Sequence, residues 1–124
     1  GSLETIVGRL RAGEVARVFS DRTVSPTYVV DAARATRAIL ERRIPTGVYH
    51  LVNTGAATWQ EVAVEAARLL GVEPRLDAVR AADVTLPAQR PLYCALSNAK
   101  LARAGIAMPT WQDALARHLR AQAG

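Results

Sequence analysis

The chain has 124 residues, of which 50% are hydrophobic and 22% charged, a composition that excludes a disordered segment and fits one globular domain. Its single cysteine, Cys94, excludes an internal disulfide, and one cysteine with two scattered histidines forms no metal-binding set. The net charge of +5 is compatible with a polyanionic ligand, either nucleic acid or a small phosphorylated molecule.

The first two residues and the longest uncharged stretch indicate the bounds of the domain and whether it spans a membrane. Gly1 and Ser2 have the appearance of a cloning remnant, so we expect a single domain over residues 3–124. The longest uncharged stretch, residues 44–60, contains proline and glycine, and we therefore expect no membrane-spanning helix and no membrane partner.

The first elements follow from hydrophobic spacing. Apolar residues recur at i, i+3, i+4 and i+7 from Leu3 to Leu10, which predicts a helix that ends at Gly13. Residues 15–19 predict a short strand.

A second helix is predicted after a polar turn. Pro26 disfavours helix at the residue before it, so we expect the helix to start with Thr27 as its N-cap and to run to about Arg43. Its predicted buried face comprises Val29, Ala32, Ala33 and Ile39. Its predicted solvent face carries charged residues at three- and four-residue spacing, namely Asp31, Arg34, Arg37 and Glu41.

Residues 48–52 form a β-rich run that is apolar on both faces apart from His50. Such a run predicts a strand covered on both sides, as in a parallel sheet. We interpret His50 as structural in this position, and the isolated Cys94 in the same way.

The second half of the chain predicts three more helices. Thr58 and Glu61 form a capping box that starts a helix ending at Gly71. A weak strand over residues 76–79, an irregular stretch over 81–90 and a short helix over 97–104 follow. A last helix starts at Thr110. We expect the tryptophans that follow the two threonines, Trp59 and Trp111, to be buried core residues. The pattern predicts an α/β fold with a small parallel or mixed sheet and about five helices.

Several catalytic signatures are missing from the sequence. There is no glycine-rich dinucleotide fingerprint, P-loop, G-x-S-x-G or H-E-x-x-H motif, and none of the three tyrosines has a lysine four residues later. We therefore expect no catalytic residue, no cofactor site and no metal site within this chain.

Three segments carry a resemblance to a known family: residues 21–31 (DRTVSPTYVVD), 47–53 (GVYHLVN) and 87–91 (PAQRP), with Trp59 and residues 109–111 (PTW) in support. In order and spacing they resemble, over essentially the whole chain, the C-terminal part of the dTDP-4-dehydrorhamnose reductases and related extended short-chain dehydrogenases. In that family the N-terminal part holds the NAD(P)-binding fingerprint and the catalytic tyrosine–lysine pair. The C-terminal part supplies most of the nucleotide-sugar site and returns one strand to the Rossmann-like sheet.

The resemblance implies a substrate-binding fragment of a cytoplasmic, NAD(P)H-dependent reductase of a dTDP-4-keto sugar. It implies that the Rossmann cofactor half is missing, that the chain alone is inactive, and that residues 47–53 are the returning strand. Residues 23–28 and the loop around Arg90 would border the nucleotide-sugar ligand.

Five residues are candidate substrate contacts. The planar guanidinium of Arg90, held between Gln89 and Pro91, suits bidentate binding of a pyrophosphate, although an exposed loop arginine is the alternative. Ser25 and Thr27 flank Pro26 at a helix start and can bind an oxyanion, with simple capping as the alternative for Thr27. Tyr28 and Tyr93 can stack on a base or sugar, or pack in the core or at its rim.

Other functions stay open at this point. A non-catalytic, reductase-like binding or regulatory module is one alternative. An arginine-rich nucleic-acid binder is another, disfavoured because the arginines are dispersed and only 5% of residues are aromatic. The unprotected apolar run at residues 48–52 further predicts a homodimer, by strand pairing or exchange of an element.

Overall fold

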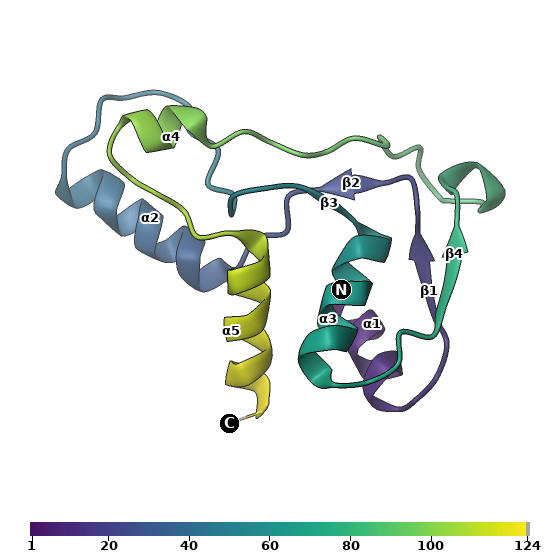
Figure 1. Ribbon diagram of the computed structural model, residues 1–124. Coiled ribbons are helices and arrows are strands. Elements are labelled where there is room, and N and C mark those ends of the chain that lie inside the picture. Colours follow the sequence, from purple (N-terminus) through teal and green to yellow (C-terminus); the bar gives the residue numbers. More distant parts are fainter. Residues whose placement is uncertain (124) are drawn as a thin grey trace. The chain divides into compact units, whose positions relative to one another are not determined.

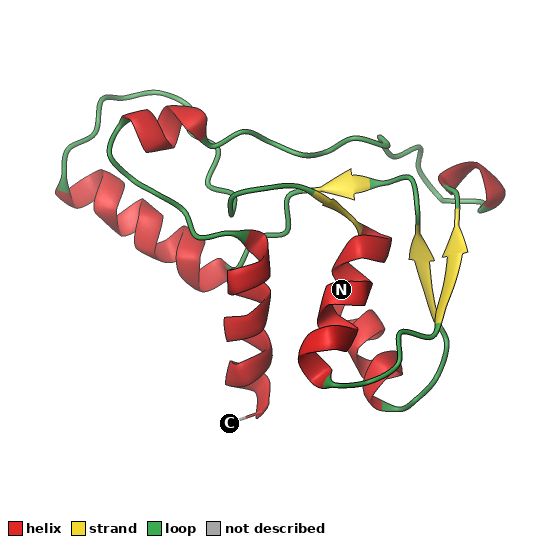
Figure 2. Cartoon of the chain, viewed as in Figure 1, coloured by secondary structure: helices red, strands yellow, loops and turns green. Residues whose placement is uncertain are grey.

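The computed structural model describes residues 1–123, which form two compact units (Figure 1). Unit 1 comprises Gly1–Val24 and Ala57–Cys94, and unit 2 comprises Ser25–Ala56 and the chain from Ala95 onward. Over the described residues the secondary structure consists of five α-helices, four short strands and one 3₁₀ turn (Figure 2). The prediction of an α/β fold with about five helices and a small sheet is confirmed.

Unit 1 is built on a parallel pair of strands. Its elements are α1 (Ser2–Arg11), β1 (Ala16–Phe19), β2 (Thr23–Val24), β3 (Ala57–Thr58), α3 (Trp59–Leu70), β4 (Leu76–Val79) and η1 (Ala81–Asp83). Strand β1 pairs in parallel with β4, from Ala16 opposite Leu76 to Phe19 opposite Val79. Ala16 and Val18 point to the buried side, where α1 and α3 pack, because alternate residues of a strand face opposite ways.

A second, shorter ladder in unit 1 was not expected from the sequence. Strand β2 pairs antiparallel with β3, with Thr23 opposite Thr58. On the other side of β2, the Thr23 N–H donates to Leu92 O (2.7 Å) and the Cys94 N–H donates to Thr23 O (2.8 Å). The prediction of only a polar turn before the second helix was wrong at β2, because two-residue strands show no periodicity and form only where tertiary contacts supply partners.

Unit 2 contains α2 (Val29–Glu41), α4 (Ala99–Arg103) and α5 (Trp111–Ala123). Its hydrophobic cluster consists of Ala35 from α2, Leu101 from α4, and Ile106 and Met108 from the segment before α5. Tyr49 and Leu51 pack against this cluster and are half-buried.

The predicted start and faces of the second helix were wrong. The N-cap of α2 is Tyr28, and Thr27 is exposed and caps nothing. Asp31, expected on the solvent face, is 3% exposed, whereas Val29 is 73% exposed. The expected solvent positions of Arg34 and Arg37 are confirmed. The helix is rotated because Asp31 has a basic partner on α5, which a periodicity argument on one helix does not reveal.

The strand predicted at residues 48–52 is absent from the described structure. Val48 is 77% exposed, and the carbonyls at the two ends of the run accept from side chains. Lys100 Nζ donates to Val48 O (2.9 Å) and Asn98 Nδ2 donates to Val52 O (3.0 Å). A strand needs a backbone partner, and the described residues present none to this run.

The two ends of α3 follow the sequence closely. In α3, the Glu61 N–H donates to Thr58 Oγ1 (3.1 Å) and the Thr58 N–H donates to Glu61 Oε1 (3.0 Å), which is the predicted capping box. Gly71 ends α3 with φ +70°, a left-handed conformation that glycine adopts without strain. Trp111 is buried as expected, but Trp59 is only half-buried. Among the described residues, no helix is long and apolar enough to span a membrane.

We predict that Thr58→Ala lowers the free energy of unfolding by about 1 kcal/mol, because the cap of α3 is lost. Urea unfolding followed by circular dichroism measures this change. The control is Thr36→Ala, whose hydroxyl bonds to Ala32 O on the exposed side of α2. It is expected to be neutral or slightly stabilising, since alanine is the better helix former. Equal losses in the two variants would contradict the capping role.

Candidate functional site

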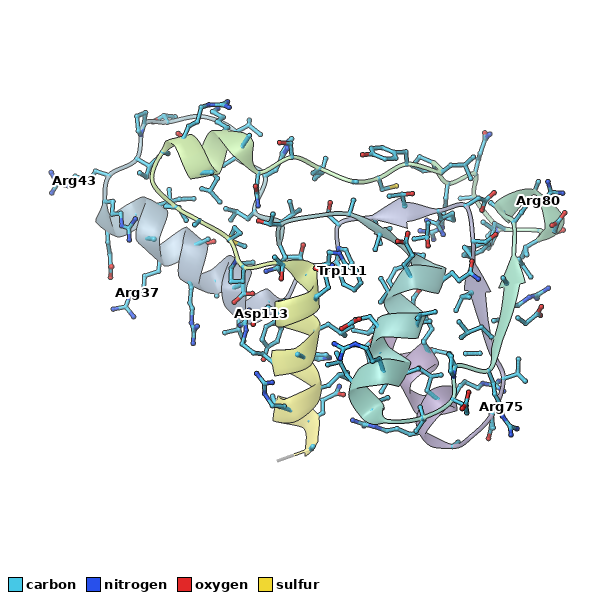
Figure 3. The ribbon with its side chains drawn as sticks, viewed as in Figure 1. Arg37, Arg43, Arg75, Arg80, Trp111 and Asp113 are labelled. Carbon is cyan, nitrogen blue, oxygen red and sulfur yellow. The ribbon has the colours of Figure 1, made fainter. Side chains whose placement is uncertain are left out.

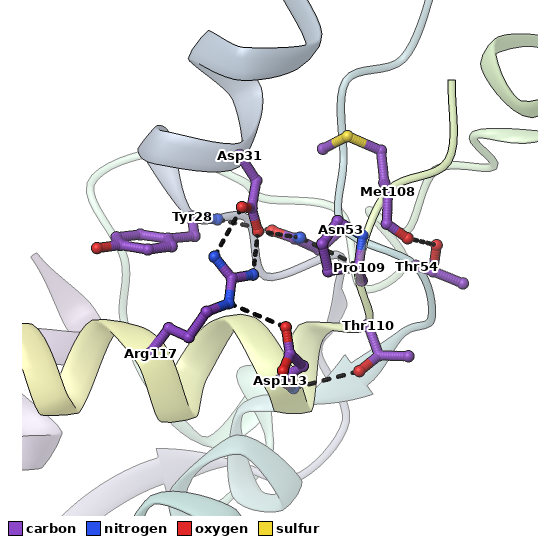
Figure 4. Close-up of polar contacts among 9 residues, drawn as sticks. All are labelled: Tyr28, Asp31, Asn53, Thr54, Met108, Pro109, Thr110, Asp113 and Arg117. Carbon is purple, nitrogen blue, oxygen red and sulfur yellow. Dashed lines mark hydrogen bonds and ion pairs between the residues drawn. The ribbon is translucent and has the colours of Figure 1, made fainter. Parts of the chain in front are cut away.

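The most buried polar cluster of unit 2 joins Asp31 of α2 to Arg117 of α5 (Figure 4). Arg117 Nη1 donates to Asp31 Oδ1 (2.8 Å) and Arg117 Nη2 donates to Asp31 Oδ2 (2.6 Å), a bidentate ion pair. The side chain of Asp31 is 3% exposed and that of Arg117 is 26% exposed. A carboxylate buried to this degree requires such a partner.

Asn53 connects this ion pair to the backbone. The residue is fully buried, and its Nδ2 donates to Asp31 Oδ2 (2.8 Å) and to Pro109 O (3.1 Å). Its Oδ1 accepts from the N–H of Tyr28, the N-cap residue of α2 (2.8 Å). One amide therefore fixes the start of α2 and the segment that leads into α5.

Electrostatics hold the pair ionised at neutral pH. The hydrogen bonds from Arg117 lower the pKa of Asp31 below 3.8 despite its burial. The same hydrogen bonds raise the pKa of Arg117, to which Asp113 Oδ2 contributes at 2.9 Å from Nε. Asp31 therefore stays deprotonated and Arg117 stays protonated near pH 7, and the pair exchanges no proton there. We call Asp31, Asn53 and Arg117 the lock, because their role is structural.

Three sequence-predicted contacts lie together just before α2, in unit 2. Ser25 Oγ accepts from the Leu96 N–H (2.8 Å), which joins residue 25 to the segment before α4. Thr27 Oγ1 donates to Ser25 O (3.0 Å). The ring of Tyr28 meets His118 edge-on, with ring centroids 5.4 Å apart, and the Arg117 guanidinium carbon lies 5.5 Å from its centroid.

The other two predicted contacts, Arg90 and Tyr93, belong to unit 1. Arg90 is exposed and makes no hydrogen bond or ion pair with any residue that the structure describes. Tyr93 is 71% exposed, and its backbone is fixed beside β2. Both side chains are therefore accessible to a ligand.

The two residues interpreted as structural, His50 and Cys94, are both exposed. Cys94 is exposed, with Sγ 3.7 Å from Pro91 O, and His50 is exposed, with Nδ1 3.2 Å from Ser97 O. Within residues 1–123, no group of three His, Cys, Asp or Glu side chains is placed to hold a metal ion.

Sequence reasoning missed the lock formed by Asp31, Asn53 and Arg117. One signal was present, since Asp113 and Arg117 lie four residues apart on the last helix. The main partner of Arg117 is 86 residues away in the chain, and no local pattern identifies such a pair.

Comparison with known proteins gives a consistent result. A family model described as the RmlD substrate binding domain matches residues 1–123. The spore coat polysaccharide biosynthesis protein SpsK of Bacillus subtilis is 31% identical over 118 residues, which cover 95% of this chain and 41% of that protein. A dTDP-4-dehydrorhamnose reductase of Mycobacterium tuberculosis is 36% identical over 121 residues, covering 95% of this chain and 40% of that protein.

A solved structure agrees with these matches. The dTDP-4-dehydrorhamnose reductase of Bacillus anthracis, solved in complex with NADP, superimposes with a TM-score of 0.81 at 26% identity. The match covers 94% of this chain and 41% of that one. The chain thus spans less than half the length of the relatives it resembles.

We predict that Asp31→Asn lowers the free energy of unfolding by about 3 kcal/mol, because it leaves the part-buried Arg117 without its main counter-charge. The matched control is Asp113→Asn, which removes an exposed partner of the same arginine and is expected to cost less than about 1 kcal/mol. Urea unfolding at neutral pH compares the two. Similar losses would show that the buried pair is not the dominant contact.

The ion pair of Asp31 and Arg117 predicts how the stability of the protein depends on pH. Because folding lowers the pKa of Asp31, its stabilising contribution is present above 3.8 and is lost as pH falls through the lower folded-state pKa. We expect Asp31→Asn to lose less stability than the parent between about pH 5 and about pH 2. Parallel acid-unfolding curves for the two proteins would contradict this assignment.

Proposed function

Since the chain belongs to the RmlD substrate binding domain family, we propose that it is the nucleotide-sugar-binding portion of a reductase. The whole protein would reduce a dTDP-4-keto sugar by hydride transfer from NAD(P)H. The observation that carries the proposal is the match of the substrate-binding family model along residues 1–123. The proteins named dTDP-4-dehydrorhamnose reductase among its relatives support the choice of substrate class.

We propose that the chemistry lies in the rest of the polypeptide. The sequence has no glycine-rich turn to receive a dinucleotide and no tyrosine–lysine pair to assist hydride transfer. The residues present therefore do not fit NAD(P)H, and the isolated chain is expected to be inactive. The lone cysteine fits a reducing compartment, and we propose the cytoplasm.

The substrate contacts that we propose in unit 1 are Arg90 and Tyr93. The exposed guanidinium of Arg90 can donate two parallel hydrogen bonds to a diphosphate. The ring of Tyr93, 71% exposed beside a fixed backbone, offers a stacking face for a base or sugar.

The contacts that we propose in unit 2 are Ser25, Thr27 and Tyr28. The Ser25 and Thr27 hydroxyls are partly used within the chain, and each keeps an unused lone pair for a ligand donor. The ring of Tyr28 contacts both His118 and Arg117 of α5, which favours one direction of the ring. The lock at Asp31 would act on binding indirectly, by holding the start of α2.

The exposed run at residues 48–52 supports the proposal that another backbone pairs with it in the whole protein. Val48 is largely exposed and the run has no backbone partner among the described residues. We propose that the rest of the polypeptide pairs with this run, and that the isolated chain forms a homodimer through it instead.

A nucleic-acid function is less well supported. Arg37 and Arg80 point away from the ribbon on different elements (Figure 3), and both are paired with carboxylates. Arg9 is paired with Glu14 and Arg68 with Glu65 in the same way. Arginines that are dispersed and paired do not form the continuous basic surface of a nucleic-acid binder.

We predict that the chain binds dTDP saturably and that Arg90→Ala weakens binding on the order of tenfold, through loss of a bidentate contact to phosphate. Isothermal titration calorimetry measures both affinities. Arg103→Ala is the control, since it removes one exposed arginine from unit 2 and is expected to bind as the parent does. Unchanged binding in Arg90→Ala would contradict its phosphate role.

The same titration with duplex DNA separates the alternative function. Binding to DNA with a steep dependence on salt, without binding of dTDP, would favour the nucleic-acid module over the reductase portion.

We predict that the isolated chain is a dimer in multi-angle light scattering. Val48→Lys should shift it towards monomer, because a charge on an unpaired edge opposes strand pairing. Val64→Lys, which places the same charge on an exposed position of α3, is the control and should leave the dimer intact. A parent that remains monomeric at high concentration would refute the dimer.

A further inference from the structure

Arg22 carries an unsatisfied donor in unit 1. The residue precedes β2, and its Nε atom is buried without any hydrogen-bond partner. The guanidinium carbon lies 5.1 Å from the centroid of the Phe19 ring. Within residues 1–123, the side chain of Arg22 makes no hydrogen bond and no ion pair.

This state is unusual for a part-buried arginine. Arg117, which is also half-buried, is bound to two carboxylates. Buried donors nearly always find an acceptor, and leaving one unpaired costs about 1–3 kcal/mol. The adjacent carboxylate does not supply the acceptor; Asp21 Oδ1 accepts from the Ala81 N–H instead (3.0 Å). Among residues 1–123, Arg22 therefore has no hydrogen-bond acceptor for its Nε–H and no counter-charge.

The backbone around Arg22 is fixed on both sides. Arg22 O accepts from the Trp59 N–H (3.3 Å), and the next residue, Thr23, donates its N–H to Leu92 O (2.7 Å). The pairing of Thr23 with Tyr93 places this part of the chain beside the segment that follows Arg90. The stack on Phe19 adds rigidity to the side chain. A fixed guanidinium loses little freedom when it binds a ligand.

We propose that Arg22 is an anion-binding residue that, together with Arg90, receives the diphosphate of the nucleotide sugar. The assignment of the diphosphate to a nucleotide sugar rests on the function proposed above. With a small shift of the side chain that uncovers Nε, its N–H would donate to one phosphate oxygen and an adjacent amino group of the planar fork to a second.

The test compares three variants of the chain in thermal unfolding and in dTDP titration. Arg22→Met keeps an unbranched side chain but removes the charge, and Arg22→Lys keeps the charge but removes the fork. Arg11→Met is the matched control, since it removes an exposed arginine of α1 in the same unit. Unfolding is measured in sodium pyrophosphate and in sodium chloride at equal ionic strength, so that screening by salt is the same.

We expect pyrophosphate to raise the unfolding temperature of the parent and of Arg11→Met, to raise that of Arg22→Lys less, and to leave Arg22→Met unchanged. We expect Arg22→Met to bind dTDP about tenfold more weakly than the parent. In sodium chloride alone, Arg22→Met should be at least as stable as the parent, because an unpaired charge has been replaced by an apolar group. A packing role alone would instead make this variant less stable.

The remaining outcomes separate the two proposals. A full pyrophosphate shift in Arg22→Met, or no shift in the parent, overturns the role of Arg22. Equal dTDP affinity in the parent and in Arg22→Met overturns that role but leaves the proposed function standing. A pyrophosphate shift that depends on Arg22, with no tighter binding of dTDP than of pyrophosphate, supports the anion site and contradicts the nucleotide ligand. If Arg22→Met does not fold, Arg22→Lys decides, and a full shift in that variant overturns the proposal.

Discussion

A carboxylate remains charged in a protein interior only if another group replaces the water it has lost, and Asp31 meets this condition through Arg117. The other features of unit 2 depend on this ion pair. It turns α2 so that Ala35 faces Leu101 and Met108, and with Asn53 it fixes Tyr28, the N-cap residue of the helix. That contact places Tyr28, since α2 has no side-chain cap, and Ser25 is placed by its bond to Leu96.

The strands of unit 1 depend on a different condition, which is the presence of a neighbouring backbone with which to form hydrogen bonds. Strand β2 is two residues long and exists because β3 lies on one side and residues 92–94 on the other. This arrangement brings the loop of Arg90 and Tyr93 to β2 and fixes the peptide at Arg22. Some arginines of the chain are paired with carboxylates, such as Arg9 and Arg117, whereas the side chains of others, such as Arg22 and Arg90, have no hydrogen-bond or ion-pair partner among the described residues. An anionic ligand would gain most by binding the unpaired arginines, because it supplies the acceptor and the negative charge that they lack.

Local patterns predicted much of the fold but less of the candidate site. The capping box of α3, the glycine that ends it and strands close to residues 16–19 and 76–79 were predicted, because caps and strand propensity act over a few residues. The parallel pairing of these two strands was not predicted. Residues 48–52 show the limit of such patterns. Their composition suits a strand, but a strand forms only where a second backbone is present. Arg90 and Tyr93 were identified by their motif, and the structure places both on the surface.

The sequence by itself determined the class of the protein: an α/β domain related to reductases, without the motifs for a cofactor or a catalytic pair. These properties depend on composition, motif order and local spacing. Only the tertiary structure decided that Asp31 is buried, that Asn53 joins two segments and that Arg22 lacks an acceptor. The physical reason is distance along the chain. Burial and hydrogen bonding depend on groups up to 86 residues away, whereas a sequence pattern describes only the neighbours of each residue.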